Sequence, residues 1–317
     1  MKTLWSWLPS RVDTRVRVAA WASLVSQILI IGTGGAVRLT GSGLGCPTWP
    51  RCTEDSFVST PEMGFHGIIE FGNRLLTFLL VIIAIVMFVF VLKMRRERPE
   101  LFRLSIVLGL GIPGQAVVGG ITVLTNLNPY VVGLHYLLSA VLVGLAAVLV
   151  YRVRMGPKTQ EWATPRPVRV IAGALMASLS VSIVMGILTT GSGPHAGDGG
   201  AARNGLDSWL LQHFHAWPSY VVLGLSVTLV GLSVMAGVGS PRFGRTAWAL
   251  LATVGAQIAV GIFQARNGLP EILVGIHMVL AAIVVTIAVS LLLAMRKEAR
   301  REEAGQLPPL QTAVSGS

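Results

Sequence analysis

Eight long apolar stretches constrain the fold of this chain more than any other feature. They lie at about 18–37, 67–92, 104–124, 131–151, 168–189, 212–236, 246–265 and 272–295. A helix of roughly 20 apolar residues crosses a bilayer core about 30 Å thick, so each stretch is long enough to span a membrane. We therefore predict an all-α integral membrane protein with eight transmembrane helices, surrounded by membrane lipid.

The composition agrees with this prediction and excludes other classes. Of the 317 residues, 53% are hydrophobic and 12% are charged, whereas soluble domains carry about 25% charged residues. The formal net charge of +11 comes from basic residues in short runs between the apolar stretches. Because these residues are not clustered among aromatic side chains on one face, the sequence argues against a nucleic-acid partner.

The distribution of basic residues predicts the orientation in the membrane. Twenty of the 25 Lys and Arg residues fall on one side of the predicted helices, counting Lys2, Lys158, Arg300 and Arg301. The other side has only Arg38, Arg51, Arg203 and Arg266, and Arg74 lies inside the second span. Cytoplasmic loops carry the excess of Lys and Arg. We expect a multi-pass protein of the cell membrane with both termini in the cytoplasm and four loops facing outward.

Two short patterns recur and indicate an internal duplication. The Thr-Gly-Ser-Gly motif at 40–43 returns at 190–193, an offset of 150 residues, and Gln115…Gly119…His135 returns as Gln257…Gly261…His277, an offset of 142. Each half then holds four helices and enters the membrane in the same direction. We predict two pseudo-symmetric four-helix bundles, residues 1–155 and 156–295, followed by a disordered cytoplasmic tail at 296–317.

Four of the six histidines fall at matching places in the two halves. His66 and His215 begin the second and sixth spans, and His135 and His277 lie near the outer ends of the fourth and eighth spans. A single histidine at a membrane interface is usually a partly solvated helix end. Four at equivalent places instead favour pairs of imidazoles from facing helices, the arrangement that a bis-histidine haem iron requires in a helical bundle.

The sequence alone also allows other metals at these histidines and other roles for His213 and His195. Zinc or copper would need a third or fourth close ligand, and the chain has only two cysteines, both in a loop. His213 is two residues from His215, so the two cannot face the same side of a helix. His195 lies in an outward loop, where it either covers the site, contacts a haem propionate or is an ordinary loop residue.

A carboxylate inside the second span is the strongest candidate for chemistry. Glu70 lies one helical turn after His66, with Asn73 on the same face and Arg74 beside them. Ionisable residues within spans are costly and mark functional sites by default. A Glu–Arg pair that only braces the helices is the alternative, and Arg74 could instead pair with a haem propionate. The second half has Ser219 in place of the carboxylate.

Cys46 and Cys52 lie in the first outward loop, separated by five residues. In an oxidising compartment a disulfide between them is the simplest interpretation. A redox-active dithiol is the functional alternative.

The motifs together resemble the haem A synthases of the CtaA type, over about residues 17–295. The resemblance rests on several segments taken together. They are Gly34–Pro47 with Trp49, Pro50 and Cys52, then Ile69–Leu75, Gly133–His135, Thr190–Asp198, Leu210–Ala216 and Gly275–His277. It implies eight helices in two bundles, and oxidation of a methyl group of haem O to the formyl group of haem A for aa3-type cytochrome oxidases.

The same resemblance implies roles for individual residues. A haem b would lie between His215 and His277, and the substrate haem would occupy the first half with His135 as a ligand. Glu70 would act in catalysis, and Cys46 and Cys52 would form a disulfide. Many members carry a histidine directly before the arginine, where this chain has Asn73. The repeat offers His66 as the replacement ligand, and we adopt that prediction.

Two other functions remain possible from sequence. A di-haem membrane cytochrome would only pass electrons, and a haem carrier would deliver its haem unchanged. For the enzyme we expect haem O as substrate, an unidentified electron donor, a possible complex with the haem O synthase, and a possible homo-oligomer. The unequal halves, with Glu70 in one only, favour the enzyme.

Overall fold

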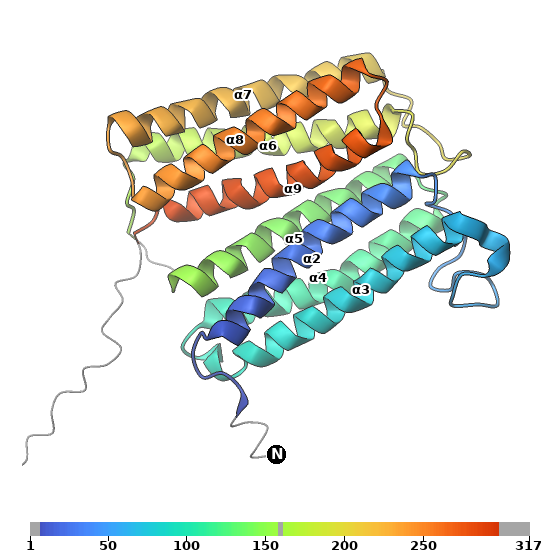
Figure 1. Ribbon diagram of the computed structural model, residues 1–317, viewed down its shortest axis with the longest axis horizontal. Helices are drawn as coiled ribbons and strands as arrows, with labels where there is room; N and C mark the ends of the chain where they lie inside the picture. The colour runs from blue at the N-terminus through green and yellow to red at the C-terminus, as the bar shows by residue number, and fades with distance from the viewer. Residues whose placement is uncertain (1–6, 158–160, 298–317) are drawn as a thin grey trace, which may run out of the picture.

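The computed structural model describes residues 7–157 and 161–297, and it is built from eight long helices (Figure 1). Their bounds are α2 Thr14–Leu39, α3 Gly64–Val91, α4 Pro99–Leu124, α5 Pro129–Met155, α6 Arg166–Ser192, α7 Ser208–Met235, α8 Pro241–Arg266 and α9 Glu271–Ala294. Each is long and apolar enough to cross a membrane. Between residues 7 and 297, leaving aside 158–160, no strand is formed. The prediction of an all-α, multi-pass membrane protein is confirmed.

Local signals set the ends of the helices. Asp13, Asn128, Asp207 and Ser240 precede α2, α5, α7 and α8, and each side chain accepts a hydrogen bond from a backbone N–H of the first turn. Proline begins α4, α5 and α8, where its missing N–H costs no helical hydrogen bond. Most helices extend a few residues beyond the predicted spans, because polar residues continue them outside the apolar stretch.

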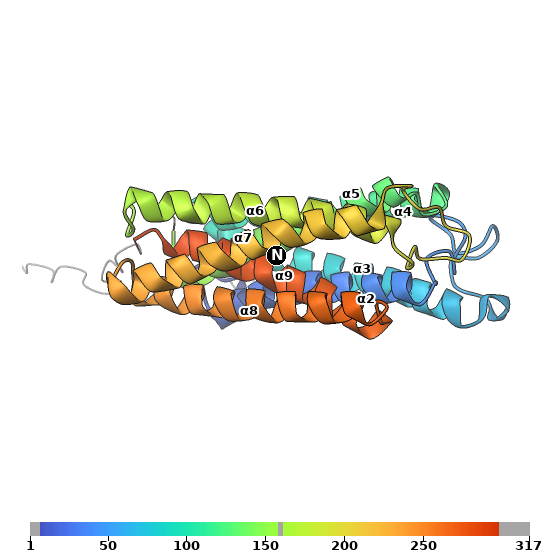
Figure 2. The ribbon, with the colours of Figure 1, turned by 90° about the horizontal axis from the view of Figure 1, so that it is seen from above.

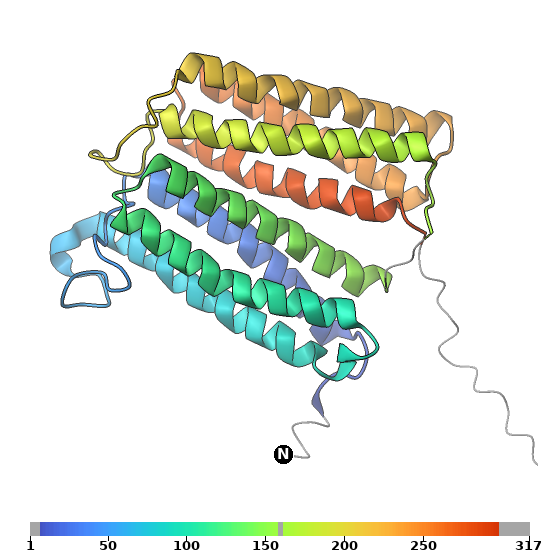
Figure 3. The same cartoon turned by 180° about the vertical axis from the view of Figure 1, so that it is seen from behind.

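The helices gather around two apolar cores. One core is built from α2, α3, α4 and α5, with Ala282 and Val285 added from α9. The other is built mainly from α6, α7, α8 and α9. The two groups lie side by side (Figures 1 and 3), and α9 contacts α2 and α5 across the boundary. We call these groups the first half and the second half; a two-fold axis relating them remains a prediction.

The four predicted outward loops meet at one end of the bundle, which we call the outer end (Figures 1 and 2). Gly43 donates its backbone N–H to the carbonyl of Gly197 at 2.8 Å, so the first and third loops are joined. The opposite, inner end carries the start of α2 and the end of α9. Which end faces the cytoplasm remains a prediction, and Lys2, Lys158, Arg300, Arg301 and the tail beyond Lys297 lie outside the described residues.

Candidate functional site

The second half brings two of the predicted ligands together. His215 of α7 and His277 of α9 have ring centroids 6.1 Å apart and ring planes inclined by 77°. Both side chains are partly buried between the helices. Within the described ranges, no other two of the four predicted ligands have their rings in contact.

The surroundings of His215 fix which ring nitrogen is available. Its Nδ1 lies 2.8 Å from the backbone carbonyl oxygen of Ser182 in α6. A carbonyl only accepts hydrogen bonds, so Nδ1 carries the proton and Nε2 keeps a free lone pair. Histidines that ligate a metal usually donate their other N–H in this way. The Ser182 contact therefore prepares His215 as a ligand through Nε2.

Glycines face three of the predicted ligand rings. A Cβ added at Gly186 would lie 2.8 Å from the ring of His215, one at Gly261 would lie 3.1 Å from His277, and one at Gly119 would lie 3.2 Å from His135. Any larger residue would push the ring away. The ligand rings thus pack directly against the neighbouring helix backbone, most closely at Gly186, where any side chain would force a shift.

In each half, a glutamine of the third helix donates a hydrogen bond to the backbone of the fourth helix. Gln115 donates to the carbonyl of His135 at 3.1 Å, and Gln257 donates to the carbonyl of His277 at 3.1 Å. In both halves the glutamine Oε1 and the histidine Nδ1 are buried without a partner in the described part of the chain. The repeated sequence pattern therefore corresponds to a repeated set of contacts.

The first half is more open. His66 is the third residue of α3 and is exposed, and its Nδ1 lies 2.9 Å from the hydroxyl of the buried Ser42. His135 is partly buried on α5. His215, by contrast, is the eighth residue of α7. The structure thus places His66 at the very start of its helix and His215 two turns inside its own.

Asn73, whose place the resemblance gives to a histidine, forms a hydrogen bond between two helices. Its Oδ1 accepts a hydrogen bond from Thr33 Oγ1 of α2 at 2.8 Å. In the present chain this position therefore joins α2 to α3, and His66 as the replacement ligand stays a prediction.

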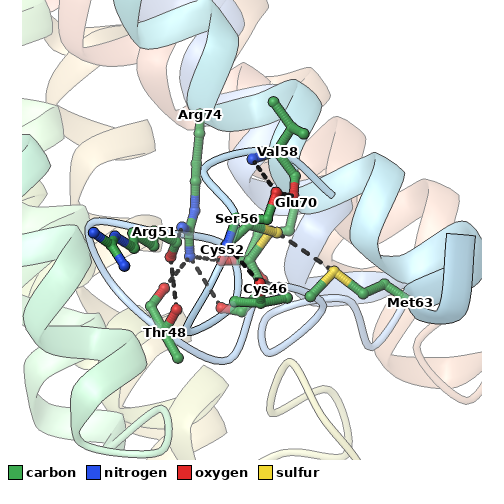
Figure 4. The surroundings of a disulfide bond; sticks show 10 residues. Cys46, Thr48, Arg51, Cys52, Ser56, Val58, Met63, Glu70 and Arg74 are labelled. Atoms are coloured by element: carbon green, nitrogen blue, oxygen red, sulfur yellow. Dashed lines mark hydrogen bonds and ion pairs between the residues drawn. A yellow bond between two sulfur atoms is a disulfide. The ribbon is translucent and has the colours of Figure 1, made fainter. Parts of the chain in front are cut away.

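Glu70 is almost fully buried, with 5% of its surface exposed, and both carboxylate oxygens are engaged (Figure 4). One accepts the backbone N–H of Cys46 at 2.6 Å, and the other pairs with Arg74 at 2.6 Å. Arg74 also donates to the carbonyls of Cys46, Thr48 and Arg51. The pair therefore anchors the first outward loop on α3.

The predicted disulfide between Cys46 and Cys52 is present, and both cysteines are fully buried (Figure 4). The disulfide closes the same loop whose backbone carbonyls accept hydrogen bonds from Arg74. The pairing of Arg74 with a haem propionate remains a prediction, because its described contacts all go to this loop and to Glu70.

The other two histidines have local partners. His195 Nε2 lies 2.9 Å from the carbonyl of Leu269, so it joins the third and fourth outward loops. His213 has its Nδ1 2.7 Å from the carbonyl of Trp209, and its ring packs on Trp209 at 4.2 Å. Neither contact reaches the pair of His215 and His277.

Several residues of the site were not identified from sequence. Ser182, which contacts His215, belongs to no motif that would reveal it. Ser42, which contacts His66, lies in the repeated Thr-Gly-Ser-Gly motif, but the motif did not reveal its contact. The roles of Gln115 and Gln257 were detectable, because both belong to the repeated pattern. Arg38 is a further case: it donates to the carbonyls of His195 at 2.7 Å and Thr190 at 3.0 Å and so joins the two halves.

The donor set fits a haem iron better than a zinc or copper ion. Two facing imidazoles supply the two axial positions of a haem. Over residues 7–157 and 161–297, no cluster of three or more His, Cys, Asp or Glu side chains is formed. The paired rings, the free Nε2 of His215 and the glycines behind the rings are all features that suit a bis-histidine haem.

The comparison with known proteins decides the family. The family of cytochrome oxidase assembly proteins named COX15-CtaA matches residues 17–289. The chain belongs to the COX15-CtaA family. The match covers all eight helices apart from the first turn of α2 and the end of α9, so the fold described above is that of a family member.

Individual relatives of this COX15-CtaA member carry one name. The chain is 28% identical over 152 residues to the Heme A synthase of Geobacillus thermodenitrificans, covering 47% of each chain. It is 24% identical over 149 residues to that of Geobacillus kaustophilus, covering 46% of each, and 28% identical over 143 residues to that of Lysinibacillus sphaericus. The matches thus span about half the length of these curated relatives.

Proposed function

We propose that this protein is a haem A synthase, which oxidises a methyl group of haem O to the formyl group of haem A for aa3-type cytochrome oxidase. The observation that carries the proposal is the pair of His215 and His277, with Nε2 of His215 left free, in a member of a cytochrome oxidase assembly family. The names of the relatives support the same reaction.

The two halves have different tasks in this proposal. His215 and His277 hold a haem b, which supplies electron transfer to the first half when it is bound. His135 and His66 hold the substrate, haem O, in the first half. The hydrogen bond between His66 Nδ1 and Ser42 leaves His66 Nε2 pointing away from the serine, so this nitrogen is the candidate ligand.

The reaction sets requirements for the residues of the first half. Each oxygen atom inserted from dioxygen into a C–H bond uses two electrons and two protons and releases one water. The first insertion gives an alcohol, and the second gives a geminal diol that loses water to the aldehyde. The chain must therefore position the methyl group, exclude bulk water and supply protons.

Glu70 is the candidate catalytic residue. It is the buried carboxylate one helical turn after His66. It accepts a hydrogen bond from the Cys46 N–H, which links it to the disulfide-closed loop at the outer end of the first half. In this position it either moves a proton or holds the substrate through the loop. We propose the proton role, with the loop limiting access of water.

The remaining expectations extend beyond the chain itself. Three of them stay predictions: a complex with the haem O synthase, which would hand over its insoluble product; an unidentified electron donor; and a homo-oligomer. A cell-membrane location with cytoplasmic termini follows from the distribution of Lys and Arg and also stays a prediction.

Extraction of haem from cells tests the proposal. The chain is expressed in cells that make haem O but not haem A, and the extracted haems are separated by chromatography and identified by mass. We expect haem A or its hydroxylated precursor. Only unchanged haems b and O, from protein with an intact haem spectrum and with reductant present, would contradict the enzyme and favour a di-haem cytochrome or a haem carrier.

A further inference from the structure

A small polar cavity lies inside the first half, between its inner end and the middle of the membrane. Its volume is about 10 Å³, and it is lined by residues of α2, α3 and α4. The polar lining comes from Ser23, Ser26 and Gln27 of α2 and from Ser105 of α4, while α3 contributes apolar side chains. Four polar side chains around one cavity are unusual at this depth, where unsatisfied polar groups are costly.

Gln27 is the residue that points to a ligand. It is 5% exposed, it lines the cavity, and its side-chain amide makes no hydrogen bond within the described part of the chain. An amide buried without a partner costs about 1–3 kcal/mol. A molecule in the cavity that both donates and accepts hydrogen bonds removes this cost.

The serines complete the coordination that a water molecule needs. The hydroxyls of Ser23, Ser26 and Ser105 each donate to a carbonyl of their own helix, at 2.9, 3.1 and 2.8 Å. Their oxygens keep lone pairs that accept hydrogen bonds. A buried water requires roughly 10–15 Å³ and two to four polar partners, and the cavity meets both conditions.

The second half lacks this feature at the matching place. The buried stripe of α4 is Leu101, Ser105, Leu108 and Ile112, and that of α8 is Phe243, Ala247, Leu250 and Val254. The two stripes are related by the same offset of 142 residues that relates Gln115 to Gln257. Ser105 therefore corresponds to Ala247, and the buried face of α6 up to Leu179 is apolar.

A second group of polar side chains lies closer to His135, beyond the apolar Leu108 and Ile112 that line the cavity. Gln115 follows Ile112 on the same stripe of α4, one turn closer to the outer end. Its amide donates to the hydroxyl of Ser139 at 2.5 Å and to the carbonyl of His135 at 3.1 Å. Ser139 again has an alanine, Ala281, as its counterpart at the offset of 142.

We propose that the cavity between Gln27 and Ser105 binds one water molecule, and that this water passes protons from the inner end toward the site at His135. The water gains a proton on one side and releases another on the other side, so its own composition does not change. The demand for protons rests on the proposed haem O oxidation, which consumes two protons for each oxygen atom inserted.

The test uses the full-length protein and three variants. Ser105→Ala introduces the residue of the second half, and Gln27→Leu combined with Ser105→Ala removes the unpartnered amide and one of the three lining hydroxyls. Ser226→Ala is the matched control, because Ser226 is also buried, donates only to its own helix and lies in α7 away from the cavity. The readouts are a structure at a resolution that shows ordered water, the haem b content, and the rate of haem A formation in H₂O and D₂O.

We expect water between Gln27 and Ser105 in the unmodified protein and in the control, and none in the double variant. The double variant should keep its haem b and its melting temperature but form haem A about tenfold more slowly, since positioned proton transfer contributes at least that much to such rates. Its solvent isotope effect should rise, which a purely structural defect would not cause.

Other outcomes overturn the proposal. An empty cavity in the unmodified protein removes the water site, and a full rate in a double variant without the water removes its proton role. If the unmodified protein holds the water but forms no haem A, the proposed function has failed and the proton role fails with it. In that outcome the water seen in the experimental structure would still support the water site, but not its role in proton transfer.

Discussion

The two histidine pairs differ in how far the protein has already assembled them. In the second half, His215 and His277 are in ring contact, and the Ser182 carbonyl orients His215. In the first half, His66 is exposed and contacts the hydroxyl of Ser42, while His135 is partly buried on another helix. A permanent cofactor suits a site that is assembled in advance, whereas a substrate must enter and leave.

The polar groups are distributed in the opposite way. The first half contains the buried Glu70, the hydroxyl of Ser139 and the cavity at Gln27, whereas the second half has apolar or smaller residues in place of Glu70, Ser105 and Ser139. Chemistry that consumes protons needs such groups close by. The comparison therefore favours the proposal that the reaction takes place in the half with the looser histidine pair.

The largest expected effect follows from removing a ligand of the assembled pair. His277→Ala should abolish haem b binding in the second half, because one axial ligand and the ring contact with His215 are both lost. The haem content per protein and the optical spectrum measure this. His213→Ala is the control, since His213 packs on Trp209 outside the pair and should leave both readouts unchanged. Full haem b content in His277→Ala would contradict the assignment.

The next effect concerns the carboxylate found only in the first half. Glu70→Gln should slow haem A formation about a hundredfold, in the range that positioned proton transfer contributes. The glutamine can still accept the Cys46 N–H, so the loop should stay in place and haem b should be retained. Glu271→Gln is the control, because this exposed carboxylate also lies at the outer end. A normal rate in Glu70→Gln would leave Glu70 only its role in anchoring the loop.

Sequence reasoning succeeded where one physical requirement dominates. Apolar stretches of bilayer length predicted all eight helices, and the helix observed at Pro129–Met155 contains the predicted span 131–151. The disulfide of Cys46 and Cys52 followed from two cysteines in one short loop. The repeat of Gln115 and His135 at Gln257 and His277 identified residues that make matching contacts in the structure.

Other features depend on backbone positions that sequence does not encode locally. The Ser182 carbonyl can reach His215 only because α6 and α7 pack closely, and any residue type supplies a carbonyl. The contact between Glu70 and the Cys46 N–H depends on the path of the whole loop. The exposure of His66 results from α3 beginning only two residues earlier, at Gly64, which hydropathy does not specify.

A smaller effect tests the looser pair itself. His66→Ala should weaken binding of haem O in the first half by at least about tenfold, because loss of a ligand should cost no less than loss of a residue that supports one. Adding Asn73→His should restore part of the affinity, because it places an imidazole one turn further along the same face of α3 as Glu70 and His66. Titration of the purified variants with haem O measures both. Unchanged affinity in His66→Ala would leave His135 as the sole ligand of the first half.

The smallest effect tests how tightly the second-half pair is packed. Gly186→Ala places a Cβ 2.8 Å from the His215 ring and 3.0 Å from its Nδ1, so the ring must shift away from the Ser182 carbonyl. Overpacking of this kind costs about 1–3 kcal/mol, and it should appear as a lower melting temperature and an altered haem b spectrum. Gly173→Ala on the same helix is the matched control, since its Cβ would meet no atom within 4 Å. The alanine there should be neutral or slightly stabilising, because alanine favours the helix over glycine. Equal behaviour of the two variants would mean that the ring of His215 is not held as closely as the structure indicates.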